Sequence, residues 1–269
     1  MKFSLQNKWV LITGASSGFG AAAAAAFAAE GAKLLLGARR LDRLKEVAAE
    51  AQKTGAPEAH FHKLDVSQTA SVETFLLWVK EKIGDRPAAG GKLHVLINNA
   101  GGAQGSDTVA NGKDADWETM LQTNVLGVLR VTRAALPLLP RDDGASIINI
   151  GSLAARSAYA GAAAYCAAKA GELQITRVLR QELFGTGIRV STVDPGLAET
   201  EFSLVRFKGD AKKAKALYAG ANPLVAADIA EILVWVATRP PHVNIDELLV
   251  KPVDQADIGK VFRRTPQPD

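Results

Sequence analysis

The chain has a single cysteine, few aromatic residues and no long uncharged apolar stretch. Cys166 is the only cysteine among 269 residues, which excludes an internal disulfide and suits a reducing compartment. No uncharged segment reaches the roughly 18 residues of a membrane-spanning helix. Residues 1–8 contain no apolar signal core. We therefore expect a cytoplasmic protein with no membrane partner.

Basic residues are in modest excess but are not interleaved with aromatic ones. The net charge is +4 and the calculated pI is about 9.1. Aromatic residues make up only 6% of the chain, whereas a single-strand binder needs stacking side chains beside its cations. We expect solvated helix faces and a solvated tail, and no nucleic-acid partner; a polyanion-binding protein would instead show strongly salt-dependent affinity. The basic groups concerned are Lys208, Lys212, Lys213 and Lys215, and Lys260, Arg263 and Arg264.

No metal site is expected. His60 and His62 alternate along an expected strand, but no carboxylate or cysteine partner accompanies them in the sequence. Cys166 is interpreted as a small packing residue rather than a nucleophile.

Apolar runs alternate with helical patterns along the whole chain. The length suits one large α/β domain, residues 1–269, better than two small ones. Continuous apolar strands joined by helices predict a Rossmann-type, doubly wound, seven-stranded parallel sheet. A surface insertion is expected at 86–91 and a substrate flap at about 199–220. The expected strands are 9–12, 34–36, 59–64, 93–97, 146–150, 188–193 and 248–250, and the expected helices are 21–30, 41–51, 71–83, 117–136, 162–184 and 227–238.

A glycine-rich turn follows the first expected strand and begins the first expected helix. Segment 13–20 reads TGASSGFG. In this context the first glycine allows a tight turn, the second lets a pyrophosphate approach closely, and the third lets the helix contact the strand. The N-terminus of the helix adds free N–H groups and partial positive charge. The alternative is a turn without a ligand. The residues expected at the cofactor are Gly14, Ser16, Ser17, Gly18, Phe19 and Gly20.

The end of the second strand carries no acidic residue. An NAD-binding protein usually has Asp or Glu about 20 residues beyond the glycines, for the ribose 2′-hydroxyl. Here the chain reads Gly-Ala-Arg-Arg, ending in Arg39 and Arg40. The planar fork of a guanidinium suits a 2′-phosphate, so we predict NADP(H). The alternative is that both arginines only begin a helix face.

A tyrosine and a lysine lie four residues apart beyond the fifth strand. Tyr165 and Lys169 share one helix face, and Ser152 follows the strand at 146–150. Tyrosine ordinarily has a pKa near 10, so proton transfer near neutral pH is helped by a fall of about two to three units. A neighbouring ammonium supplies that stabilisation. The motif alone also occurs on ordinary helix surfaces, but with Ser152 and the glycine turn it predicts catalysis.

These motifs occur in an order that resembles the short-chain dehydrogenase/reductase family over nearly the whole chain. The matching elements are TGxxxGxG at 13–20, Asp65 after the third strand, NNAG at 98–101, Asn124, Ser152, YxxxK at 165–169 and PG at 195–196. The resemblance implies a homodimer or homotetramer, formed through two long helices.

The same resemblance implies roles for single residues. Asp65 and Val66 would contact adenine, and Asn98, with Ala100 and Gly101, would line the cofactor groove. Asn124 would support a water chain to Lys169. The residues implied at the nicotinamide end are Pro195, Gly196 and Thr200.

Segment 194–210 is similar to the NADP-dependent 3-hydroxy acid dehydrogenase branch of the family, as is 238–245, whereas 154–156 and 159–162 depart from it. We therefore expect hydride transfer between nicotinamide and a small 3-hydroxy acid, such as serine, allo-threonine or 3-hydroxypropionate, or its carbonyl. Tyr165 would be the acid in reduction and the base in oxidation, and Lys169 would tune it and bind ribose. Ser152 would position the substrate oxygen. The alternatives are a broad carbonyl reductase of neutral ketones and a nucleotide-sensing protein without catalysis.

A small hydroxy acid offers little apolar surface, so its carboxylate needs a cation in a partly closed site. Arg156, four residues past Ser152, and Arg206, within the flap, are the candidates. Closure of the flap would exclude water and strengthen the contact. The alternatives are that Arg156 is a surface residue and that Arg206 anchors the flap by an ion pair with Glu199 or Glu201.

Overall fold

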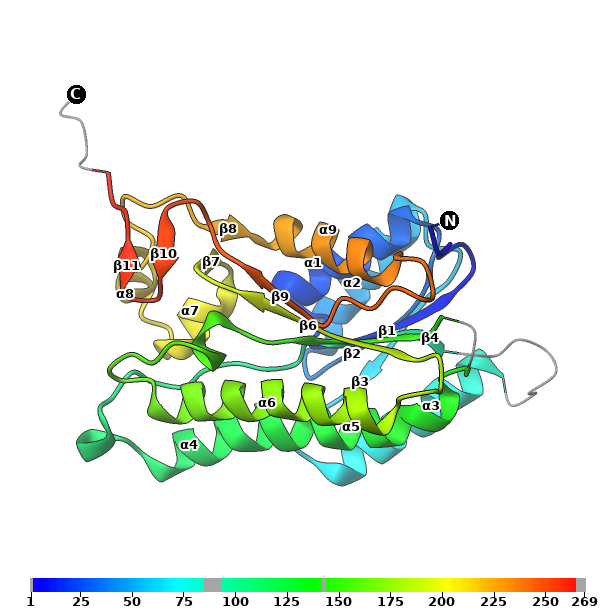
Figure 1. Ribbon diagram of the computed structural model, residues 1–269, viewed down its shortest axis with the longest axis horizontal. Helices are drawn as coiled ribbons and strands as arrows, with labels where there is room; N and C mark the ends of the chain where they lie inside the picture. Colours follow the sequence, from blue (N-terminus) through cyan, green and yellow to red (C-terminus); the bar gives the residue numbers. More distant parts are fainter. Residues whose placement is uncertain (1, 85–92, 142–143, 265–269) are drawn as a thin grey trace.

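Seven parallel strands form one sheet in the computed structural model, which describes residues 2–84, 93–141 and 144–264 (Figure 1). The spatial order is β3-β2-β1-β4-β5-β6-β9, so the winding reverses between β1 and β4. This is the doubly wound sheet that the sequence predicts, and every expected strand is present. The expected insertion at 86–91 lies outside the described residues. The strands are β1 (Trp9–Thr13), β2 (Lys33–Ala38), β3 (Ala59–Lys63), β4 (Leu93–Asn98), β5 (Ser146–Ile150), β6 (Arg189–Pro195) and β9 (Glu247–Val250).

Helices cover both faces of this sheet (Figure 1). The inner strands β1, β4, β5 and β6 are buried along their whole length, whereas the edge strands β3 and β9 are partly exposed. Along β1, Val10 packs in the same cluster as Phe27 of α1, whereas Leu11 packs in the cluster of Phe75 of α3. This alternation explains why an inner strand such as β1 is a continuous apolar run. One face carries α1 (Gly18–Ala29), α2 (Leu41–Thr54) and α9 (Ala226–Ala237), and the other carries α3 (Thr69–Ile83), α4 (Asp114–Leu121), α5 (Gly127–Ala135) and α6 (Ala163–Glu182).

The single helix predicted over 117–136 is divided. A π-helical turn, η3 (Gln122–Leu126), separates α4 from α5, and a short 3₁₀ turn, η4 (Leu136–Leu138), follows α5. Asn124 lies in the π-helical turn and its amide donates to the Met120 carbonyl (2.8 Å). Single π-helical turns inside longer helices often occur at functional sites, and the apolar periodicity of this segment gave no sign of one.

Short elements gather at the carboxyl edge of the sheet, at the left of Figure 1. The expected flap contains two short helices and is tied to its neighbours: Lys208 pairs with Asp116 (2.7 Å). The last members of the basic tail are exposed, as expected, but they are also bonded to the rest of the fold. Arg263 donates to the Leu217 carbonyl (3.0 Å), and Arg264 pairs with Asp254. These elements are η2 (Val109–Asn111), η5 (Leu153–Ala155), β7 (Ala198–Glu199), α7 (Glu201–Arg206), α8 (Ala211–Ala216), β8 (Leu224–Val225), β10 (Gln255–Asp257) and β11 (Lys260–Val261).

Within the described ranges, no helix is both long and apolar enough to cross a bilayer.

Candidate active site

A cavity of about 490 Å³ opens at the carboxyl edge of the sheet, where the winding reverses between β1 and β4. Doubly wound sheets bind their ligands at this position. Most residues that the sequence assigns to the cofactor line it. These are Gly14, Ser16, Ser17, Gly18, Phe19, Arg39, Arg40, Asp65, Val66, Ala100, Gly101, Tyr165, Lys169, Pro195, Gly196 and Thr200.

The glycine turn has the conformation that its sequence predicts. Gly14 and Gly18 adopt φ values of +65° and +53°, in the left-handed region that favours glycine. A Cβ on Gly14 would lie 2.8 Å from the Ala100 Cα, and one on Gly20 would lie 2.5 Å from the Gly14 carbonyl oxygen. Gly20 therefore holds the helix against the turn and does not itself line the cavity. With the N-terminus of α1 beside it, the turn is shaped to hold a pyrophosphate.

Thr13, the residue before the first glycine, fixes the neighbouring loop. Its hydroxyl accepts hydrogen bonds from the N–H groups of Asn99 (3.0 Å) and Ala100 (2.9 Å). The side-chain amide of Asn99 donates a hydrogen bond to the carbonyl of Gly14 (3.1 Å). The turn after β1 and the turn after β4 are thus one hydrogen-bonded unit, which forms the floor of the cavity.

Two arginines stand at the cavity where β2 ends. Arg39 and Arg40 are both exposed and both line it. The Arg40 guanidinium donates to the hydroxyls of Ser16 (3.2 Å) and Ser17 (2.6 Å). Serine hydroxyls and a guanidinium on one wall fit a phosphate group, so the residues present suit a dinucleotide with a 2′-phosphate.

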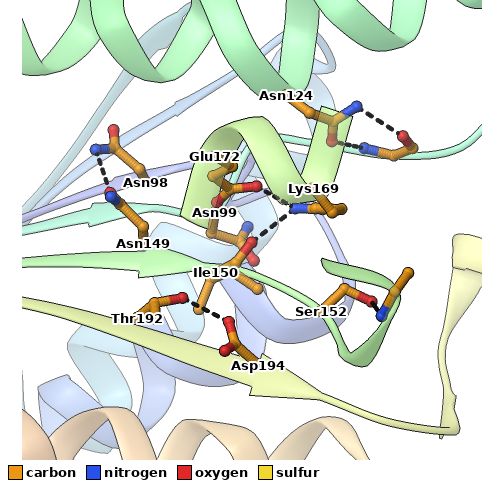
Figure 2. Close-up of polar contacts among 12 residues, drawn as sticks. Asn98, Asn99, Asn124, Asn149, Ile150, Ser152, Lys169, Glu172, Thr192 and Asp194 are labelled. Carbon is orange, nitrogen blue, oxygen red and sulfur yellow. Dashed lines mark hydrogen bonds and ion pairs between the residues drawn. The ribbon is translucent and has the colours of Figure 1, made fainter. Parts of the chain in front are cut away.

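The assignment of Asn98 to the cofactor groove is wrong. Asn98 is buried, and its amide donates to the Thr132 hydroxyl at 2.9 Å. It also donates to the Asn149 side chain, at 2.9 Å (Figure 2). Successive residues of a strand face opposite sides of the sheet, and Asn98 faces helix α5, which carries Thr132. Asn99 is the asparagine that lines the cavity.

Asn124 fastens the loop that follows β4. Its amide donates to the Gly102 carbonyl (2.9 Å), and its side-chain oxygen accepts from the Gly102 N–H (3.0 Å) (Figure 2). Within the described residues no hydrogen bond joins Asn124 to Lys169. The role of Asn124 in a water chain to Lys169 stays a prediction.

The serine and the tyrosine both reach the cavity wall. Ser152 follows β5, and its hydroxyl accepts from the Ala154 N–H (3.1 Å), which orients the side chain at the start of η5 (Figure 2). Tyr165 lies on the first turn of α6, is 8% exposed, and its ring packs 5.6 Å from that of Phe202. A hydroxyl and a phenol on one wall can hold and protonate a carbonyl oxygen.

Lys169 lies one turn beyond Tyr165 and is buried. Its ammonium donates to the Ile150 carbonyl (2.7 Å) and to the Glu172 carboxylate (2.6 Å) (Figure 2). Burial opposes its charge, but the carboxylate of Glu172 and then the phenol of Tyr165 leave the pKa of Lys169 above its ordinary value. The site therefore holds a permanent cation beside its phenol. Glu172 was not among the residues predicted from the sequence.

The structure separates the two arginines proposed for a substrate carboxylate. Arg156 is ion-paired with buried Asp194 and with Glu247. It does not line the cavity, so its guanidinium is already committed to carboxylates of the chain. The prediction that Arg156 binds substrate does not fit this arrangement. Arg156 is exposed, as the alternative of a surface residue expects, but it is held by two ion pairs.

Arg206, at the end of α7, is 8% exposed and lies against Tyr159 and Tyr165, behind the cavity wall, so like Arg156 it does not itself line the cavity. It donates to the Tyr159 hydroxyl (2.7 Å) and to the Gly105 carbonyl (3.2 Å), and its guanidinium carbon lies 6.0 Å from the centre of the Tyr165 ring. Among the described residues, no carboxylate forms an ion pair with it. The alternative of an ion pair from Arg206 to Glu199 or Glu201 is therefore wrong, since Glu201 pairs with Arg40.

Apolar side chains form the rest of the wall near Tyr165. Phe202 and Val205, both from α7, line the cavity directly. The sequence predicts a flap over 199–220 but not these two wall residues, although their spacing of three residues on one helix face is a signal for a shared surface. A small apolar cluster beside Tyr165 comprises Ala103, Met120, Ala154 and, partly buried, Trp117, Tyr159, Ala164, Cys166, Phe202 and Ile258.

No group of three or more potential metal ligands occurs among residues 2–84, 93–141 and 144–264. The ring of His62 stacks on Trp78 and that of His60 packs near Trp9. Contrary to the expectation, His60 also has a carboxylate partner, because its Nε2 lies 3.1 Å from the Oε2 atom of Glu58.

Known proteins match this fold and this order of motifs. The family model for short chain dehydrogenases matches residues 8–210. A sulfoacetaldehyde reductase of Chromohalobacter salexigens is 44% identical over 92% of this chain and 94% of its own length. The NADP-dependent 3-hydroxy acid dehydrogenase of Schizosaccharomyces pombe is 41% identical over 97% of this chain and 98% of its own length.

A solved structure has a similar fold. The closed form of a serine dehydrogenase complexed with NADP+ superposes with a TM-score of 0.84 at 39% identity, covering 96% of this chain and all (100%) of that one. The resemblance inferred from the motifs is confirmed: the chain belongs to the short chain dehydrogenase family of oxidoreductases.

Proposed function

We propose that the chain is an NADP-dependent oxidoreductase that interconverts the hydroxyl and carbonyl forms of a small organic acid. The 3-hydroxy acids serine, allo-threonine and 3-hydroxypropionate are the first candidates. The relatives named above support this substrate class, because one is a 3-hydroxy acid dehydrogenase and one solved neighbour is a serine dehydrogenase with NADP+. Arg39 and Arg40 support the choice of NADP(H), since both stand at the cavity where a 2′-phosphate fits.

Each catalytic side chain has one task in this proposal. The nicotinamide supplies or accepts the hydride when the cofactor is bound. Tyr165 gives its proton to the carbonyl oxygen in reduction and takes it back in oxidation. Ser152 holds that oxygen through its hydroxyl, and the Lys169 ammonium stabilises the phenolate that remains on Tyr165.

Arg206 is the observation that favours an acid over a neutral ketone. It is a nearly buried cation beside Tyr165, and its described partners are a phenol and a backbone carbonyl, both of them uncharged. A buried charge is costly without a counter-charge. A substrate carboxylate that reaches Arg206 supplies one, and the carbinol at C3, one carbon further along the substrate than C2, then lies toward Tyr165.

The same cation suits a sulfonate, which is also a compact anion. The sulfoacetaldehyde reductase among the relatives is the reason to include this second candidate. A neutral carbonyl compound gains nothing from the cation, so replacing Arg206 distinguishes the two anionic classes from a neutral ketone.

The decisive experiment replaces Arg206 with Met and measures steady-state kinetics with NADP(H). Substrates are serine, allo-threonine, 3-hydroxypropionate, sulfoacetaldehyde and a neutral ketone. We expect KM for the preferred acid to rise at least tenfold, because a charge-assisted hydrogen bond contributes about 1.5–3 kcal/mol, while KM for the ketone changes less than twofold. Lys215→Met, an exposed cation of α8, is the control. Equal behaviour of parent and Arg206→Met enzyme toward acids and ketones would favour the broad carbonyl reductase.

We also propose that the protein is a homodimer or homotetramer. Leu121 of α4, Leu129 of α5 and Val178 of α6 are large apolar side chains that remain between 42% and 44% exposed on adjoining helices. Light scattering after size-exclusion chromatography measures the assembly, and a monomer at micromolar concentration would contradict the proposal.

A further inference from the structure

The catalytic lysine shares its charge with a carboxylate that the reaction described above does not use. Glu172 follows Lys169 by three residues on α6, so both side chains lie on one helix face. The carboxylate accepts from the ammonium at 2.6 Å, and the two residues are only 1% and 6% exposed. Figure 2 shows the ammonium held between Glu172 and the carbonyl of Ile150. A solvent-excluded ion pair of this kind acts over short range with little screening.

Few other charged groups reach this pair. Asp194 of β6 lies on the sheet side, accepts from the Thr192 hydroxyl (2.6 Å) and is paired with Arg156, which also contacts Glu247 of β9. On the side of β5 the neighbours are uncharged, since Asn149 donates to Thr176 of the same helix (2.8 Å).

The remaining elements packed against α6 add no charge at Glu172. η3 carries no ionisable side chain, and η5 carries none before Arg156. The acidic residues of α4 are Asp114, Asp116 and Glu118, and none of them is among the groups that shift the pKa of Glu172. Among the residues that the structure describes, the charges that act on the Glu172 carboxyl are those of Lys169 and Asp194.

We propose that Glu172 is a positioning residue for proton transfer: it fixes the Lys169 ammonium at the end of β5 and offsets part of its charge, and so sets the pH at which Tyr165 exchanges its proton. The inference rests on the proposed function, in which Tyr165 is the proton donor and Lys169 stabilises its phenolate. An ammonium favours the phenolate, whereas a carboxylate beside that ammonium opposes it.

The protonation of Glu172 falls in the range where such an enzyme works. Burial raises the pKa of Glu172 to about 7, although the ammonium of Lys169 acts against this rise. Above that pH the carboxylate is ionised and weakens the field of the lysine at Tyr165. Removing the carboxylate charge therefore makes the phenolate easier to form, and the pH profile of alcohol oxidation moves to lower pH.

The test compares Glu172→Gln with Glu172→Asp and the parent enzyme. The amide oxygen of glutamine still accepts from Lys169 but carries no charge, whereas aspartate keeps the charge. Oxidation rates with NADP+ and the preferred hydroxy acid are measured from pH 6 to 10. We expect the pH of half-maximal kcat to fall by about 0.5–1 unit in Glu172→Gln and to stay within about 0.2 unit of the parent in Glu172→Asp.

A second readout needs no substrate turnover. The phenolate of Tyr165 absorbs near 295 nm, and the difference between each protein and its Tyr165→Phe counterpart isolates this one group in the complex with NADP+. The titration midpoint moves with the kinetic profile if Glu172 acts through Lys169. Glu182→Gln, an exposed carboxylate at the end of the same helix, is the matched control and leaves both midpoints unchanged.

Each outcome decides the inference. Unchanged midpoints in Glu172→Gln, a shift to higher pH, or an equal shift in Glu172→Asp would overturn it. Glu172→Met removes the charge without the amide and carries the same expectation if the glutamine variant is unstable. Full turnover in Tyr165→Phe would instead remove the proposed function, while the absorbance titration would still report on Glu172.

Discussion

Arg40, where β2 meets α2, forms an ion pair with Glu201 in the first turn of α7 (Nη2–Oε2, 3.0 Å). Both side chains line the cavity, so the pair joins the phosphate-binding wall to the flap. The hydrogen bond from Arg40 is the main reason that the pKa of Glu201 lies below its ordinary value. The guanidinium that suits a 2′-phosphate is therefore already in contact with a carboxylate.

Glu201→Gln is expected to strengthen NADP binding relative to NAD. A 2′-phosphate must share Arg40 with Glu201, and removing the carboxylate charge ends that competition. Exposed ion pairs contribute about 0.2–1 kcal/mol, so the dissociation constant for NADP should fall by up to about fivefold. Titration calorimetry with both cofactors measures the ratio, and Glu46→Gln, an exposed acid of α2, is the control. A parallel change for NADP and NAD would show that Glu201 acts only on the flap.

Replacing Arg39 and Arg40 together with alanine is expected to have the opposite effect. Each charge-assisted hydrogen bond to a phosphate contributes about 1.5–3 kcal/mol, so losing both should weaken NADP by roughly 10²-fold or more. NAD has no 2′-phosphate, and its affinity should change little. The two dissociation constants are measured by quenching of protein fluorescence. Equal weakening of both cofactors would make the arginines structural.

Tyr165→Phe keeps the ring that packs on Phe202 but removes the hydroxyl. General acid–base groups typically contribute 10²- to 10⁴-fold, and kcat should fall by at least this much. Binding of the cofactor should persist, because the phosphate-binding turn is untouched. Single-turnover hydride transfer at saturating NADPH gives the rate, with cofactor affinity measured on the same preparation. Turnover near that of the parent would remove Tyr165 from the mechanism.

The sheet and the cofactor residues were predictable because their signals are local. The inner strands β1, β2 and β4 are largely apolar runs bounded by turn residues. The glycines of 13–20 have positive φ at two positions, a backbone conformation that favours glycine. The tyrosine–lysine spacing needs nothing but helical geometry. The order of these motifs along the chain then indicated the family.

The errors concern features that depend on tertiary contacts. Asn98 and Asn99 are neighbours in sequence, and only the pleat of β4 decides that the second faces the cavity. Arg156 was expected at the substrate, but Asp194 and Glu247, which are 38 and 91 residues away in the chain, hold its guanidinium. The sequence did not predict a role for Glu172, because a carboxylate three residues after a lysine is common on a solvated helix.

Arg189 provides the last prediction, which concerns stability rather than catalysis. This residue begins β6, is 4% exposed, and donates to the carbonyls of Gly144 (3.0 Å), Val236 (3.2 Å) and Ala237 (2.7 Å). The last two belong to the C-terminal turn of α9, whose carbonyls have no partner within the helix. A cation there also interacts favourably with the negative end of the helix dipole.

Arg189→Met fills the space but removes the donor from the buried carbonyls of Gly144 and Ala237, while the Val236 carbonyl keeps the backbone N–H of Arg239 (3.3 Å). An unsatisfied buried polar group costs about 1–3 kcal/mol. Because more than one buried carbonyl loses its donor, we expect the free energy of unfolding to fall by about 2–4 kcal/mol. Denaturant unfolding followed by circular dichroism measures the loss. Arg189→Lys should restore part of it, because one ammonium reaches fewer carbonyls than a guanidinium fork. The kcat of the folded variant should stay at the parent value, since Arg189 does not line the cavity. A variant as stable as the parent would mean that water satisfies the end of α9 without the arginine.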